Sequence, residues 1–169
     1  MRRIKPRAFF FAVALICAAF MGYAFYAEHV LELTPCPLCM LQRGGVLLVM
    51  ALSLIAAAHN PQGRFGWKAY GTLGFLFAGL GASISARHVW LQSLPEDLVP
   101  ACAPSLDYML EVFPMGEMLR TILMTSGECA DIDWVFLGLS MPAWTFIWFV
   151  IFALVLGYAG WAFRSLRGS

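Results

Sequence analysis

Charged side chains are scarce in this sequence: they make up 12% of its 169 residues, whereas soluble domains carry about 25%. The formal net charge is only +1, so nothing indicates a basic surface, and we expect no nucleic-acid partner. Hydrophobic residues, by contrast, make up 61% of the chain. This composition excludes an ordinary soluble protein and indicates a protein that lies in a lipid bilayer.

Acidic residues are missing altogether from four long apolar segments, and a helix that spans a bilayer needs about 20 apolar residues. We predict membrane-spanning helices at about residues 8–27, 40–58, 69–87 and 141–163. The predicted fold class is therefore an all-α membrane protein, a four-transmembrane-helix bundle in which residues 1–169 form a single membrane domain. Loops at about 28–39 and 89–140 connect the helices on one side.

A cleavage signal is missing after the first apolar segment. Phe25-Tyr26-Ala27, just before Glu28, lack the small-x-small pattern that ends a signal peptide. The apolar run is also longer than the usual core of such a peptide. We therefore expect an uncleaved helix, with Cys17 buried in it as a small hydrophobic residue.

The two signs of charge fall in different parts of the chain. Most basic residues lie at the termini or between the second and third segments: Arg2, Arg3, Lys5, Arg7, Arg64, Lys68, Arg164 and Arg167. All ten acidic residues lie in the other two loops: Glu28, Glu32, Glu96, Asp97, Asp107, Glu111, Glu117, Glu128, Asp131 and Asp133. Since Lys and Arg collect in cytoplasmic loops, we expect a multi-pass protein with both termini cytoplasmic and the acidic loops outside.

The sequence has only five cysteines, and two of them form the motif Cys36-Pro37-Leu38-Cys39 at the start of the second segment. Pro37 suits the first position of a helix, which places Cys39 in the first turn, where unpaired N–H groups favour a thiolate. Arg43 follows Cys39 by four positions and therefore lies on the same helix face, where its charge favours the thiolate too. These features favour a redox-active dithiol.

Two other uses of the motif remain open at this point, namely half of a zinc site and a structural disulfide. Structural zinc has four ligands, and the sequence lacks a second closely spaced pair of Cys or His residues. The remaining cysteines are Cys17, Cys102 and Cys129. We therefore predict no metal site.

The long second loop holds Cys102 and Cys129, which we expect to pair in an oxidising compartment. Their disulfide would stabilise the fold by about 3–4 kcal/mol in a chain-entropy model. Between them, residues 113–124 predict a short helix that lies flat on the membrane surface or packs on the end of the bundle. His88, near the end of the third segment, either hydrogen-bonds a ligand at the membrane surface or caps its helix.

Taken together, these motifs resemble the DsbB family of bacterial thiol–quinone oxidoreductases. The resemblance covers nearly the whole chain and includes the four-helix topology. It is carried by Cys36-Pro37-Leu38-Cys39 with Gln42-Arg43, by Ala86-Arg87-His88, by Cys102 and Cys129, and by Leu137-Gly138-Leu139-Ser140-Met141-Pro142. The resemblance implies an enzyme of the bacterial inner membrane whose active cysteines face the periplasm.

The resemblance also implies a function: reoxidation of DsbA, a soluble periplasmic thiol oxidase, with transfer of its electrons to a membrane quinone. The donor would attack Cys102, Cys129 would then attack Cys36, and Cys39 would be left as the thiolate that faces the quinone. Arg43 would stabilise that thiolate and the quinol oxygen, assisted by His88. The expected cofactor is ubiquinone or menaquinone. The pair that meets the donor is expected in water, and the pair that meets the quinone at the lipid boundary.

Two alternatives remain for the function. One keeps the chemistry but changes the donor to a dedicated sulfhydryl partner other than general DsbA. The other is a non-catalytic membrane protein whose four loop cysteines form structural disulfides or hold a metal. The spacing of Cys36 and Cys39 and the position of Arg43 favour the electron relay over this last alternative.

Overall fold

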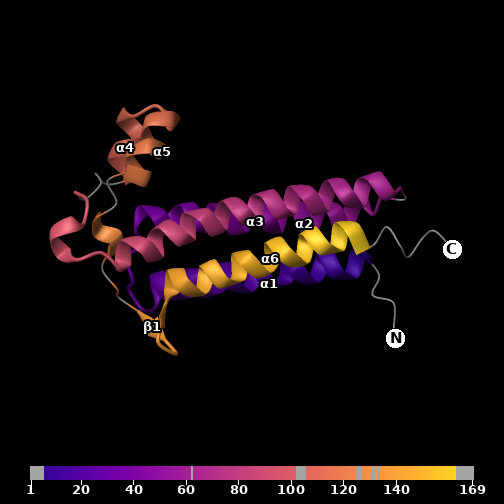
Figure 1. The fold of residues 1–169 in the computed structure, drawn as a ribbon, viewed down its shortest axis with the longest axis horizontal. Coiled ribbons are helices and arrows are strands. Elements are labelled where there is room, and N and C mark those ends of the chain that lie inside the picture. Colours follow the sequence, from indigo (N-terminus) through magenta and orange to yellow (C-terminus); the bar gives the residue numbers. More distant parts are fainter. Residues whose placement is uncertain are drawn as a thin grey trace.

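Four long helices lie side by side and form the body of the protein (Figure 1). The computed structural model describes residues 6–61, 63–101, 106–124, 127–130, 132 and 134–162. The long helices are α1 (Pro6–His29), α2 (Pro37–His59), α3 (Arg64–Gln92) and α6 (Met141–Ala162). Each is long and apolar enough to cross a membrane, which confirms the predicted four-helix membrane fold.

Three of the helices, α1, α2 and α3, are longer than the apolar segments that predicted them, and α6 is described to Ala162. The second begins at Pro37, as its proline predicts, and the third continues to Gln92, so His88 lies within it. The first ends at His29 rather than at Ala27, which brings Glu28 into the helix. The backbone hydrogen bonds of a membrane helix can continue through polar or charged residues beyond the apolar segment. Hydropathy alone therefore underestimates the length of the helix.

Small residues allow α3 and α6 to pack closely. A Cβ atom added at Gly71 would lie 2.6 Å from the Cα of Gly160, and one added at Gly81 would overlap the ring of Phe149. Phe149 and Leu156 are buried in a core that also contains Phe10 of α1. The glycines of α3 therefore permit close van der Waals packing, by which helices embedded in lipid associate.

The connection between α3 and α6 lies at one end of the bundle, which we call the loop end (Figure 1). It contains the short helices η1 (Glu96–Leu98), α4 (Leu106–Val112), α5 (Met115–Met124) and η2 (Gly127–Ala130). Within the described residues, α1 begins and α6 ends at the opposite end of the bundle (Figure 1).

Helix α5 corresponds to the short helix predicted at 113–124, and it packs on the end of the bundle. Its buried residues Met118 and Ile122 join a cluster with Leu38 and Leu91, which come from α2 and α3. Arg87 of α3 also donates from Nε to the Leu123 carbonyl oxygen at 2.8 Å. Met115 and Met124 remain exposed. Contact of this exposed side with the membrane surface stays a prediction.

A two-stranded hairpin, not predicted from the sequence, leads into α6. Strand β1 (Val135–Phe136) pairs antiparallel with β2 (Leu139–Ser140). The two turn residues, Leu137 and Gly138, both have positive φ, at 51° and 80°. This combination is typical of the tight turn whose twist matches that of paired strands. Trp144 of α6 donates to the Phe136 carbonyl oxygen at 3.0 Å and holds the hairpin on the helix.

Candidate functional site

The site is built around the first turn of α2. Cys36 is the N-cap residue, and its Sγ accepts a hydrogen bond from the Cys39 backbone N–H at 3.4 Å. Pro37 takes the first helical position, where a missing N–H has no cost. This geometry places the two sulfur atoms 3.0 Å apart, which is longer than the 2.05 Å of a disulfide. Both are free thiols here, positioned to form a disulfide after a small rotation.

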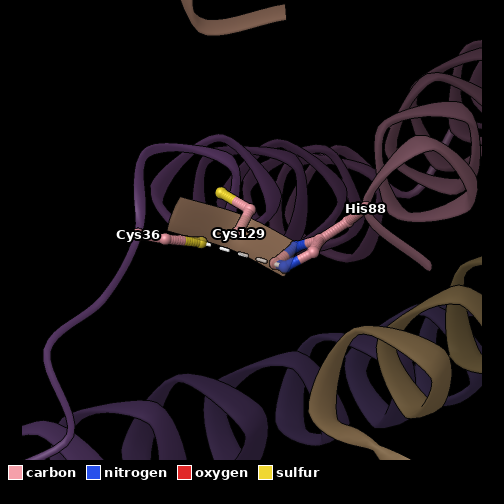
Figure 2. Close-up of side chains that lie close together, drawn as sticks. All are labelled: Cys36, His88 and Cys129. Atoms are coloured by element: carbon pink, nitrogen blue, oxygen red, sulfur yellow. Dashed lines mark hydrogen bonds between the residues drawn. The ribbon is translucent and has the colours of Figure 1, made fainter. Parts of the chain in front are cut away.

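Cys129 lies beside this pair, although it is distant in sequence. Its Sγ, the Cys36 Sγ and a His88 ring nitrogen all lie within 4.8 Å of one another (Figure 2). The Gly127 N–H donates to the Ala101 carbonyl oxygen at 3.3 Å, and a side chain at Gly127 would overlap the Pro100 carbonyl. Glycine at position 127 therefore permits η2 to lie close to the backbone of Pro100 and Ala101, and this contact positions Cys129.

The predicted location of Cys129 in water is wrong for this structure. Its side chain is 1% exposed and belongs to the cluster formed by Leu38, Leu91, Met118 and Ile122. A thiol is a small hydrophobic group, so burial among these residues is favourable. Cys129 is a free thiol, while Cys102 lies outside the described residues, so their disulfide stays a prediction.

His88 is buried, with 2% of its surface exposed, and it links two parts of the site. Its Nδ1 lies 3.0 Å from the Gln42 side-chain amide, and its Nε2 lies 3.9 Å from the Cys36 Sγ. Figure 2 shows the Cys36 and His88 side chains pointing toward each other. Because Gln42 occupies one ring nitrogen, the other is fixed in direction toward the sulfur atoms.

Arg43 lies on the same helix as Cys39 and lines the same cavity, but its hydrogen bonds are made elsewhere. Its Nη1 donates to the Glu28 carboxylate, and its Nη2 donates to the Ala24 carbonyl oxygen at 3.3 Å. The guanidinium also lies over the ring of Phe25. In this state the charge of Arg43 is therefore largely satisfied by α1, and its contact with a quinone stays a prediction.

The Cys36 and Cys129 thiols are both protonated at neutral pH in this reduced state. Hydrogen bonding with Cys129 lowers the pKa of Cys36, but hydrogen bonding with Cys39, burial and the charge of Cys39 outweigh this and raise it to about 12. The contact with Cys36, burial and the Cys36 charge raise the pKa of Cys129. Each thiol therefore keeps its own proton, because burial disfavours a thiolate and a second thiolate beside it would be repelled.

An apolar cavity of about 180 Å³ opens beside the sulfur atoms. Its polar lining includes Cys36, Cys39, Arg43 and His88, and its apolar walls include Phe149. An apolar cavity of about 150 Å³ is enough to hold a benzene ring. The space next to Cys39 therefore suits a single flat ring.

The cavity adjoins a second, aromatic groove between α1 and α6. This groove has a volume of about 350 Å³. It is lined by Phe20, Tyr23, Trp134, Phe136, Met141, Trp144, Thr145 and Trp148, six of which also line the first cavity. The sulfur site thus has an apolar approach from the side of the bundle that would face lipid.

Two residues of the site, Gln42 and Glu28, were not predicted as site residues. Gln42 contacts His88, and Glu28 pairs with Arg43. Gln42 follows Cys39 by three positions, so the shared helix face was a signal for its inclusion. Glu28 gave no comparable signal, because it comes from a different helix.

The chain is similar over nearly its whole length to a known family. The family profile described as "Disulfide bond formation protein DsbB" matches residues 6–159. Relatives named "Disulfide bond formation protein B" include one from Marinobacter nauticus, 51% identical over 91% of this chain and 90% of its own length. Others come from Hahella chejuensis, 47% identical over 97% and 96%, and from Xanthomonas campestris pv. campestris, 46% identical over 95% and 94%. The chain therefore belongs to the DsbB family of disulfide bond formation proteins.

Proposed function

We propose that this protein reoxidises a DsbA-like periplasmic thiol oxidase and passes the electrons through two cysteine pairs to a membrane quinone. The observation that carries this proposal is the position of Cys129. This residue lies next to Cys36 and Cys39, and all three line the cavity at the loop end of the bundle. Family membership supports a role in disulfide bond formation, and four apolar helices support a place in the membrane.

The relay runs through four cysteines in a fixed order. The donor thiolate attacks Cys102 of the Cys102–Cys129 disulfide, and the donor leaves oxidised after its second thiol attacks the mixed disulfide. The freed Cys129 thiolate attacks Cys36 of the Cys36–Cys39 disulfide, and Cys39 leaves as a thiolate. Cys102 then attacks Cys129, which restores the outer disulfide and leaves Cys36 reduced. Two electrons have moved from the donor to Cys36 and Cys39.

The residues around Cys39 suit the last transfer. A quinone bound in the cavity would accept two electrons and two protons and leave as quinol, while the Cys36–Cys39 disulfide forms again. Arg43 lines the cavity and could stabilise the negative charge that develops on a quinone oxygen, provided that its side chain turns away from Glu28. His88 Nε2, directed at Cys36, is placed to carry a proton to or from the sulfur. The single benzoquinone ring of ubiquinone matches the size of the cavity, whereas the two fused rings of menaquinone would extend toward the adjoining aromatic groove.

A coupled assay with the purified full-length protein tests the proposal. Reduced donor and quinone are mixed with the protein in detergent, and quinol formation is followed by the loss of quinone absorbance. We expect one quinol for each donor disulfide formed. Cys39→Ser should abolish turnover, whereas Cys17→Ser should retain it, because Cys17 is buried in the α1 core. The absence of quinol with correctly folded protein would overturn the proposal.

A trapping experiment identifies the donor. In the Cys129→Ala variant, Cys102 has no internal partner, so its thiolate attacks the disulfide of the oxidised donor and forms a mixed disulfide. Without Cys129 no internal thiol can displace the donor from Cys102, so this species should accumulate and is preserved by acid quenching. Mass spectrometry of the captured partner is expected to find the general DsbA-like oxidase. Capture of a different, dedicated thiol protein would keep the chemistry and correct the donor.

A further inference from the structure

The reduced site gathers metal-ligating atoms from three separate parts of the chain. Cys36 precedes α2, His88 lies in α3 and Cys129 lies in η2, and one ligand atom from each lies within 4.8 Å of the others (Figure 2). No metal site was predicted from the sequence because Cys and His residues do not form a second closely spaced pair. The fold brings together three ligand residues that are far apart in the sequence.

We propose that the fully reduced protein binds a thiophilic divalent cation of the Zn²⁺ class through Cys36 Sγ, Cys129 Sγ and His88 Nε2. The dimensions are close to those required. Tetrahedral zinc with bonds of about 2.0–2.3 Å places neighbouring ligand atoms roughly 3.5–3.8 Å apart. Cys36 Sγ and His88 Nε2 are already 3.9 Å apart. Small side-chain rotations therefore suffice to close the site.

Gln42 prepares His88 for this role. Metal-binding histidines commonly use the second ring nitrogen for an orienting hydrogen bond. The Gln42 Nε2 lies 3.0 Å from His88 Nδ1, and the Gln42 side chain is itself buried. Metal binding requires this amide to turn by half a rotation, so that its oxygen accepts from Nδ1–H and the His88 Nε2 lone pair faces the sulfur atoms.

The charge balance selects three protein ligands rather than four, with a water molecule from the adjoining cavity completing the tetrahedral shell. Two thiolates and a neutral imidazole cancel the charge of a dication, so the occupied site would be neutral. A neutral complex suits a place where His88 is 2% and Cys129 1% exposed, because an uncompensated buried charge is costly. Cys39, 3.0 Å from Cys36, is not needed for this balance.

A bound metal ion would also block disulfide exchange, because it takes the lone pairs with which Cys36 and Cys129 attack.

Co²⁺ is a suitable probe, because tetrahedral thiolate complexes of cobalt absorb in the visible and near ultraviolet. Full-length protein in detergent is reduced anaerobically with a phosphine, freed of metal and titrated with Co²⁺. We expect one ion per chain, intense tetrahedral bands, and displacement of cobalt by Zn²⁺. Protein with its disulfides intact should give no bands.

Variants separate the proposed site from an ordinary Cys-x-x-Cys chelate. His88→Ala and Cys129→Ser should weaken binding by more than tenfold, and Gln42→Leu by about 10–100-fold. Cys39→Ser and the matched control Cys17→Ser should bind as the parent does. Since His88 is buried, His88→Gln is measured alongside, with elution volume and helical content as checks of folding. Unchanged binding in both folded His88 variants, or loss in Cys39→Ser, would overturn the proposal.

The inference needs only reduced thiols and His88, and no quinone, so it can fail independently of the proposed function. A second readout uses turnover. Zn²⁺ added to the reduced protein should stop quinone reduction, and a chelator should restore it. Turnover that continues when the site is filled, as shown by complete loss of the cobalt bands, would count against the site.

Discussion

At the scale of single residues, the least expected feature is the partner of Arg43. Its position in the sequence predicted a helix face shared with Cys39, and both residues line the cavity. The sequence could not predict that Glu28 takes the guanidinium, because the two residues come from different helices and meet only after packing. The structure therefore describes an arginine held by α1, which must exchange partners to reach a ligand oxygen.

Glu28→Gln should improve the use of quinone. Without the carboxylate, Arg43 is freer to turn toward the cavity, so the KM for quinone should fall by about twofold to fivefold, as for a partly exposed ion pair. Steady-state quinone reduction measures this change. Glu32→Gln, at an exposed carboxylate nearby, should leave the KM unchanged. A KM that stays constant or rises in Glu28→Gln would show that Glu28 positions Arg43 rather than competing for it.

The reactivity of Cys36 should depend on pH over an unusual range. Its pKa is raised from 9.0 to about 12, so at a given pH the folded reduced protein holds less Cys36 thiolate than an unfolded chain does. The rate of alkylation by iodoacetamide should rise about tenfold per pH unit beyond pH 9. Peptide mass spectrometry after timed labelling gives this rate, and the unfolded protein serves as control. A plateau near pH 9 in the folded protein would contradict the shift.

At the scale of secondary structure, apolar length predicted the four long helices well. The hairpin β1–β2 was missed because its turn begins with Leu137, a residue that rarely has positive φ. The position of η2 on the loop end was not predicted, for a different reason. It depends on contact between Gly127 and Pro100, which no local pattern encodes.

Alanine substitutions of two glycines in α3 should affect stability differently, depending on which atoms lie near each glycine. Gly81→Ala should destabilise by about 1–3 kcal/mol, because the added methyl group overlaps the ring of Phe149. Gly79→Ala should be neutral or stabilising, because nothing lies within 4 Å and alanine favours a helix. Thermal unfolding in detergent compares the two variants. Equal changes of stability in the two variants would mean that the contact between Gly81 and Phe149 does not control the result.

At the scale of the whole molecule, the bundle fixes which distant segments meet. The sequence predicted Cys36, Cys39, Arg43 and His88 as site residues, and the structure places all four around one cavity. It could not predict that Cys129 is buried beside them, because that depends on how the long connection packs on the loop end. The location of Cys102 and the side of the membrane remain predictions from charge and family resemblance.

The central claim is that Cys39 passes electrons to a quinone in the cavity, and a visible absorption spectrum tests it most directly. The Cys36→Ser variant leaves Cys39 without its disulfide partner, and it is titrated with quinone under anaerobic conditions. We expect a new visible band, because a thiolate in contact with a quinone absorbs by charge transfer, and no band in Cys36→Ser/Cys39→Ser. Absence of the band, or its persistence in the double variant, would show that Cys39 does not meet a quinone in the cavity.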